Sequence, residues 1–144
     1  MSRPTALWLT TALLTLTGTA QAEALEARLY KSPSCGCCSA YARQLAERGV
    51  DVEVVETHDL GGVKQAAGVP YGEGACHTIE LEGYVIEGHV PFAAIDRLLE
   101  ERPDIDGIGL AGMPVGTPGM PGPQQAPFEV KQFDDRRATP WMTL

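Results

Sequence analysis

Sulfur chemistry is concentrated in one short stretch of this chain. Three of its four cysteines, Cys35, Cys37 and Cys38, fall in the sequence SCGCC, and the fourth, Cys76, is followed directly by His77. A thiolate is both the nucleophile of disulfide exchange and a strong ligand for soft metal ions. These residue types therefore indicate a redox dithiol, a pair of structural disulfides or a metal site.

Structural disulfides explain this spacing poorly. Four cysteines allow two bridges in three connectivities. A bridge between the neighbours Cys37 and Cys38 closes a strained small ring. A bridge from Cys35 to Cys38 closes almost no chain, whereas a disulfide stabilises mainly by closing a long loop. Cys35 and Cys38 are better interpreted as candidate catalytic residues of a redox pair, which leaves Cys37 without a role.

The residues around SCGCC are predicted to place it at the start of a helix. Glu26–Lys31 is short and half apolar, as a strand is, and Ser34 is the predicted N-cap of a helix that runs from Cys35 to Gly49. Val50–Glu56 alternates as a second strand does. A helix N-terminus lowers the pKa of a thiol through its partial positive charge, so we expect reactive thiols there.

The next part of the chain completes a predicted α/β fold. Asp59 caps a short helix, Thr78–Leu81 and Tyr84–Glu87 form a hairpin, and a last helix follows Pro91. This is the order of a thioredoxin-like fold (βαβαββα), with a right-handed parallel crossover first and the hairpin as an antiparallel edge. In that fold the segment that enters the third strand faces the first helix, so we expect Cys76 beside the other cysteines.

An ordered C-terminal extension is predicted to follow this thioredoxin-like domain of residues 23–103. Residues 107–127 are rich in Gly and Pro and contain Met113 and Met120, a composition that often indicates a flexible tail. The sequence FEVKQF that comes next alternates like a short strand, which a flexible tail does not need. We therefore expect residues 104–144 to wrap the domain and pack on it.

The first 22 residues have the pattern of a secretory signal peptide. A charged start, a short apolar stretch and the small-x-small sequence Ala20-Gln21-Ala22 are typical of such leaders, and an uncleaved anchor is the alternative. After cleavage we expect an exported protein with no membrane contact. The net charge of −8 offers no basic surface, which argues against nucleic acid as a partner.

Four sulfurs that converge on one place favour a metal site. Thiolates suit zinc and Cu(I) equally well. The adjacent pair Cys37 and Cys38 does not match the spaced cysteine pairs of structural zinc sites, and methionine thioethers prefer Cu(I). Copper, as Cu(I), is therefore predicted over zinc. The predicted ligands are Cys35, Cys37, Cys38, Cys76, His77, Met113 and Met120.

Two further histidines are not predicted to be ligands. His89 stands just before the last helix and is interpreted as solvated or capping, and His58 as a surface residue. His77 would point away from Cys76 if both lay in one strand, so it is either a ligand or a supporting group.

Three separated motifs carry a resemblance to a known family. YKSPSCGCC, ACHTIELEGYVIEGHVP and GMPVGTPGM together resemble the CopG-type periplasmic copper-resistance proteins, over about residues 29–133. The resemblance implies a thioredoxin-like fold with a CxCC motif (Cys35, Cys37 and Cys38). It also implies a polynuclear Cu(I) site that Cys76 completes, periplasmic localisation and redox handling of copper during detoxification.

The sequence thus leads to two functional hypotheses. The first is a periplasmic copper-resistance protein that holds one or more Cu(I) ions, with possible copper oxidoreductase activity and periplasmic copper-handling or electron-transfer proteins as partners. The alternative is a thiol–disulfide oxidoreductase that uses Cys35 and Cys38 on protein substrates.

Overall fold

The computed structural model describes residues 24–144, so the predicted signal peptide, residues 1–22, lies outside the described part of the chain. Three helices and seven strands follow one another in the order β1 (Glu26–Lys31), α1 (Gly36–Glu47), β2 (Asp51–Glu56), α2 (Leu60–Ala66), β3 (His77–Leu81), β4 (Tyr84–Glu87), α3 (Phe92–Glu101), β5 (Gly107–Gly109), β6 (Glu129–Asp134) and β7 (Arg137–Thr143). The predicted order of elements as far as α3 is confirmed.

All seven strands form one mixed sheet in the order β2-β1-β3-β4-β5-β6-β7. The β1 and β2 strands are parallel, as the predicted crossover requires, and β3 runs antiparallel to both β1 and β4. The prediction that the hairpin forms an edge is wrong. β5 pairs in parallel with β4, and β6 and β7 continue the sheet, so residues beyond 103 cover the edge that β4 would otherwise expose.

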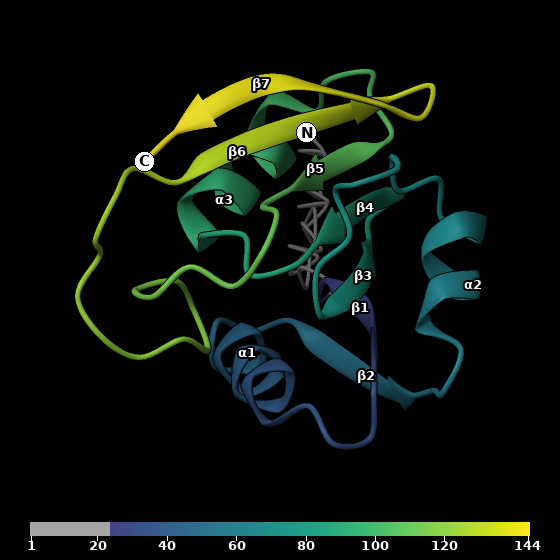
Figure 1. Ribbon diagram of the computed structural model, residues 1–144, viewed down its shortest axis with the longest axis vertical. Coiled ribbons are helices and arrows are strands. Elements are labelled where there is room, and N and C mark those ends of the chain that lie inside the picture. Colours follow the sequence, from purple (N-terminus) through teal and green to yellow (C-terminus); the bar gives the residue numbers. More distant parts are fainter. Residues whose placement is uncertain (1–23) are drawn as a thin grey trace, which may run out of the picture.

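The helices lie on both faces of the sheet. Figure 1 shows α1 and α3 on one side and α2 on the other, with β2 and β7 at opposite ends of the sheet. A sheet covered on both faces needs strands that are apolar on both sides at its centre. On one face the central strands carry a row of fully buried partners, Leu29, Ile79, Ile86 and Ile108. On the other face the buried pair Thr78 and Glu87 is polar. None of the helices described between residues 24 and 144 is long and apolar enough to cross a membrane.

The α1 helix and its N-cap each lie one residue later than predicted. Cys35, and not Ser34, is the N-cap, because its Sγ accepts a hydrogen bond from the Cys38 backbone N–H at 3.3 Å. The buried face of α1 then continues at helical spacing through Cys38, Tyr41, Ala42 and Leu45. A sulfur that caps the helix is thereby held at its positive end.

A buried lysine supports the loop that leads into α1. The side chain of Lys31, at the end of β1, is only 2 % exposed, and its Nζ donates to the carbonyl oxygens of Ser32 and Pro33. The same Nζ forms an ion pair with Glu56 of β2 at 3.0 Å. Because three acceptors surround the ammonium group, the turn before Cys35 is tied to the sheet.

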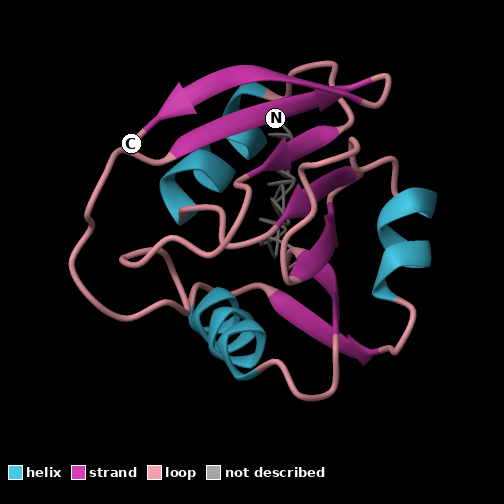
Figure 2. Cartoon of the chain, viewed as in Figure 1, coloured by secondary structure: helices cyan, strands magenta, loops and turns pink. Residues whose placement is uncertain are grey.

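The Gly/Pro-rich segment runs from β5 to β6 and comes beside α1, as the long loop of Figure 2 shows. Part of it is folded on itself. The Thr117 hydroxyl donates to the Pro114 carbonyl, and backbone hydrogen bonds link Met120 with Gly116 and Thr117. Thr117 is buried, which is unusual for a residue of a glycine- and proline-rich loop.

Candidate metal centre

The four cysteines of the chain lie together at the amino end of α1. Each pair of their sulfurs lies within 4.8 Å, although Cys76 is far from the other three in sequence. The Sγ of Cys37 is 3.5 Å from that of Cys35 and 4.0 Å from that of Cys76. The Cys38 Sγ lies 3.4 Å from the Cys76 carbonyl oxygen. The structure therefore brings together all four cysteines that the sequence nominated as ligands.

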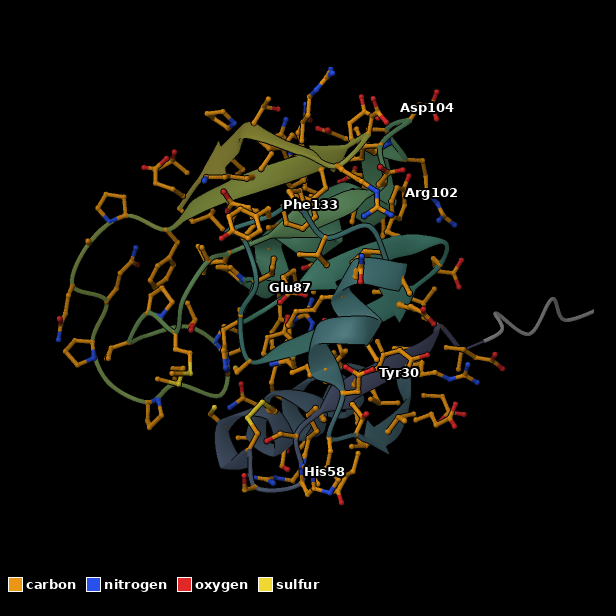
Figure 3. All side chains as sticks on the ribbon, turned by 45° about the vertical axis from the view of Figure 1, so that its right-hand side comes forward. Tyr30, His58, Glu87, Arg102, Asp104 and Phe133 are labelled. Atoms are coloured by element: carbon orange, nitrogen blue, oxygen red, sulfur yellow. A yellow bond between two sulfur atoms is a disulfide. The ribbon has the colours of Figure 1, made fainter. Side chains whose placement is uncertain are left out.

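Two of these cysteines are joined. Cys35 and Cys38 form a disulfide, drawn in yellow in Figure 3, and Cys37 and Cys76 are free thiols. Sulfurs that share a disulfide have no thiolate to offer, so the four cysteines act together as ligands only after this bond is reduced. The fold places both a redox-capable pair and two further thiols at one point.

A second group of donors overlaps the first. Cys76, His77 and His89 each offer a ligand atom within 4.8 Å of the others. The Nε2 of His89 lies 2.9 Å from the Cys76 Sγ, and the Nδ1 of His77 lies 3.5 Å from it. Cys76 therefore belongs both to the sulfur cluster and to a Cys-His-His cluster.

The prediction that His89 is solvated or capping is wrong, because His89 is fully buried. Pro91 occupies the N-cap of α3, and Gly88, with a φ of 77°, turns the chain so that His89 enters the interior. The register of the predicted hairpin could have placed His89 near His77. Thr78 pairs with Glu87, so the residues just outside this pair, His77 and Gly88–His89, must lie at the same end of the hairpin.

His77 is buried without a complete set of partners. The β3 strand begins at His77, so Cys76 precedes the strand and the two side chains are not forced onto opposite faces. The His77 Nε2 is the one buried side-chain nitrogen or oxygen in residues 24–144 that has no hydrogen-bond partner. Burial, with His89 and Lys64 nearby, lowers the pKa of His77 to about 3. The ring is therefore neutral and has an unused position.

Burial also sets the protonation of the neighbouring groups. It raises the pKa of Cys76 to about 12, and the nearby Cys37 adds to this effect. It lowers the pKa of His89. In the metal-free protein Cys76 is therefore a thiol, and its S–H faces an imidazole that is neutral at pH 7.

A buried carboxylate fixes the segment that carries Cys76. Glu87 is fully buried at the centre of the molecule (Figure 3) and forms an ion pair with Lys64 at 2.5 Å. It also accepts hydrogen bonds from the Ala75 backbone N–H at 2.6 Å and the Thr78 hydroxyl at 2.7 Å. Because Ala75 precedes Cys76, this network connects α2, β3 and β4 to the cysteine. Sequence reasoning assigned no role to Glu87 or Lys64.

Tyr41, the two methionines predicted as ligands and His58 complete the description of the region. Tyr41 packs its ring 4.7 Å from His77 and 5.6 Å from His89, and its hydroxyl donates to the Val90 carbonyl. Met113 is 52 % exposed, and Met120 lines a hollow with Ala40, Gln44 and Phe92. His58 is exposed at the surface, as predicted (Figure 3).

Comparison with known proteins identifies the family. A family described as "Protein of unknown function, DUF411" matches residues 74–120, a stretch that contains Cys76, His77 and His89. Two solved structures, named as forms 2 and 1 of copper resistance protein CopG, are 36 % identical to the chain and superpose on it with a TM-score of 0.77. Each match covers 85 % of this chain and 99 % or 98 % of the CopG chain. The chain belongs to the CopG family.

Membership in the CopG family confirms the resemblance that the three sequence motifs indicated. No curated protein matches the chain. The mixed α/β architecture of seven strands and three helices is similar to that of the CopG structures. Together with the cysteine cluster, these relatives support a copper-related role.

Proposed function

We propose that this protein binds copper as Cu(I) in copper resistance, with the ions as its cargo. One observation carries the proposal: four cysteine sulfurs and two buried histidines from separate parts of the chain converge on one place. Thiolate and neutral imidazole are the ligand types that Cu(I) prefers. The predicted ligands Cys35, Cys37, Cys38, Cys76 and His77 are joined here by His89.

An unsatisfied buried donor atom supports metal binding at this cluster. A buried nitrogen without a hydrogen-bond partner, such as the His77 Nε2, costs stability unless something else satisfies it. The same donors also suit zinc, which remains the alternative metal. The copper resistance of the named relatives favours copper.

We propose more than one ion per protein. The two donor groups share Cys76, so one group does not use up the ligands of the other. A thiolate carries several lone pairs and can bridge two soft ions, and Cys37 is close enough to both Cys35 and Cys76 to do so after reduction. A polynuclear site is therefore compatible with these contacts.

We also propose that the disulfide and the bound copper exchange electrons. Reduction of the Cys35–Cys38 disulfide takes up two electrons and two protons and yields two thiols. Oxidation of two Cu(I) ions to Cu(II) releases two electrons, so the two half-reactions balance. On this proposal Cys35 and Cys38 are the redox residues, and a periplasmic electron-transfer or copper-handling protein is the partner.

We also infer a thioredoxin-like unit, residues 23–103, with an extension, residues 104–144. The strand order β2-β1-β3-β4, with only β1 and β2 parallel, supports this assignment, and so does the pairing of β5 with β4. The copper resistance of the relatives and the leader-like N-terminal sequence support export to the periplasm.

An anaerobic titration of the reduced protein with Cu(I), against a competing chelator, tests the binding proposal. We expect tight uptake of two or more ions per protein. Replacing Cys37 or Cys76 with serine should reduce both the number of ions and the affinity, whereas Ser39→Ala, beside the motif, should change neither. Weak uptake by a protein with all four thiols free would refute the proposal.

The disulfide supports one alternative, a thiol–disulfide oxidoreductase that uses Cys35 and Cys38. This alternative expects the metal-free protein to turn over a disulfide substrate, and expects Cys37→Ser and Cys76→Ser to leave that turnover unchanged. Copper binding that depends on Cys37 and Cys76, without such turnover, excludes it.

A further inference from the structure

The segment of residues 114–120, here called the strap, touches the metal centre through its backbone. We infer that the Pro118 carbonyl is a positioning group that fixes His89 as the Nδ1–H tautomer and presents its Nε2 to the metal donors. This inference rests on the proposed function, because it assigns His89 to the copper site. It adds the residues that orient the imidazole.

The tautomer follows from the hydrogen bond. The Nδ1 of His89 lies 2.7 Å from the Pro118 carbonyl oxygen. A carbonyl oxygen only accepts hydrogen bonds, so Nδ1 must carry the proton. In a neutral imidazole the other nitrogen then has a free lone pair, and this Nε2 lies 2.9 Å from the Cys76 Sγ. The bond at one side of the ring thereby aims the lone pair at the cysteine.

Hydrogen bonds on both sides of Pro118 hold its carbonyl in place. Its turn is closed by hydrogen bonds from the Thr117 hydroxyl to Pro114 and between the backbones of Gly116 and Met120. The Gly119 N–H donates to the Gln44 side-chain oxygen of α1 at 3.2 Å. Pro118 is therefore anchored by a buried threonine before it and by α1 after it.

Gly119 allows the strap to approach this closely. A Cβ atom at Gly119 would lie 2.6 Å from the Cys37 carbonyl oxygen, 3.0 Å from the Tyr41 nitrogen and 3.3 Å from the His89 Cε1. Two of these neighbours are helix backbone, so they cannot move aside cheaply. The φ of Gly119 is also 79°, which favours glycine. Any side chain at this position must push the strap away from His89.

Groups that orient a metal-ligating histidine typically affect metal affinity about 10- to 100-fold. Without the Pro118 carbonyl, His89 can populate the tautomer that carries a proton on Nε2, and that form has no lone pair for a metal at this nitrogen. Loss of the strap contact should therefore weaken binding without removing any ligand.

The first measurement is made on the metal-free, reduced protein. Nitrogen-15 NMR of histidine-labelled protein distinguishes a protonated from an unprotonated ring nitrogen. We expect the Nδ1–H tautomer of His89 to dominate at pH 7. A dominant Nε2–H tautomer in the wild-type protein overturns the inference outright, whatever the copper titration gives.

A substitution at Gly119 then moves the strap. Gly119→Ala should give a mixture of His89 tautomers and about ten-fold weaker Cu(I) binding with an unchanged number of ions. Gly83→Ala is its control, because Gly83 has a similar φ of 86° but an added Cβ meets nothing within 4 Å. Gly83 also lies in the hairpin turn, at the end of β3 opposite His77.

A substitution at Gln44 disturbs the strap without a steric clash, and it serves if Gly119→Ala fails to fold. Gln44→Leu removes the acceptor for the Gly119 N–H and should shift the tautomers in the same direction, whereas Gln44→Glu keeps an acceptor and should restore the wild-type ratio. Wild-type tautomers and affinity in both Gly119→Ala and Gln44→Leu contradict the inference. Absence of Cu(I) binding in the wild type instead refutes the proposed function, and the tautomer is still read independently.

Discussion

The Nε2 of His89 lies 2.9 Å from the Sγ of Cys76, and the two residues flank one hairpin, Cys76 just before β3 and His89 just after β4. This contact links the cysteine cluster at the start of α1 to the buried pair His77 and His89. The solvent exposure of the donors therefore decreases from the partly exposed Cys35 to the fully buried His77 and His89.

We predict that His89→Gln weakens Cu(I) binding at least about ten-fold, because it removes an imidazole nitrogen that faces Cys76. The measurement is the same anaerobic competition titration. His58→Gln is the matched control, since His58 is exposed and belongs to neither donor group. Equal affinities for the two variants would remove His89 from the site.

We predict that Glu87→Gln lowers the free energy of unfolding by about 3 kcal/mol or more, because it leaves the Lys64 ammonium without its buried counter-charge. Denaturant unfolding of the metal-free protein measures this change. Glu80→Gln, an exposed carboxylate one strand away, should change it by no more than about 0.5 kcal/mol. In copper titrations Glu87→Gln should also weaken binding, since the Ala75–Cys76 segment loses its charged anchor. Similar stabilities for the two variants would contradict this role of Glu87.

We predict that the metal-free protein becomes less stable as the pH falls from 7 toward 4. Histidine takes up a proton near pH 6.5 in the unfolded chain, whereas burial keeps His77 neutral to about pH 3 in the folded one. The unfolded state thus binds more protons in this window, so the free energy of unfolding falls with falling pH, by up to about 1.4 kcal/mol per unit for each such histidine.

Urea unfolding at several pH values tests this dependence. His77→Gln should flatten the slope even if it changes the overall stability, and His58→Gln should keep the wild-type slope. A slope that is the same in the wild type and in His77→Gln would show that His77 is protonated in the folded protein.

Met113 and Met120 remain predicted thioether ligands. Met113→Leu and Met120→Leu preserve side-chain volume and should cost less than about 1.5 kcal/mol of stability. If the thioethers bind Cu(I), each substitution lowers the affinity several-fold, and we expect the larger effect for Met120 because the strap carries it. Unchanged titrations for both variants would restrict the site to cysteine and histidine.

Several features could be predicted because they depend on local patterns. Apolar alternation and turn residues defined the elements up to α3, with most boundaries close to those observed. The thioredoxin-like order of elements, in which the segment that enters the third strand faces the first helix, also indicated that Cys76 would meet SCGCC. The N-cap was off by one residue because the Cys35 sulfur competes with the Ser34 hydroxyl for the role.

Other features depend on contacts between distant residues. His89 was misassigned because its burial follows from the turn at Gly88 and from the strap, which pairs with its other nitrogen. The hairpin edge was misassigned because β5, the strand that covers β4, lies in the Gly/Pro-rich segment, whose composition hides its pairing. The alternation of FEVKQF did predict the strand that is observed as β6, but not the strand with which it pairs.

The sequence by itself determined the donor types, the reactive position of the cysteines at a helix start and the family, because these are properties of short motifs. Only the tertiary structure decided that Cys76, His77 and His89 form one cluster, that Lys31 and Glu87 are buried charges, and that Pro118 holds the imidazole. The physical reason is desolvation. Burial shifts the pKa of Cys76, His77 and His89. It also obliges buried polar atoms to find partners, and burial is a property of the packed chain alone.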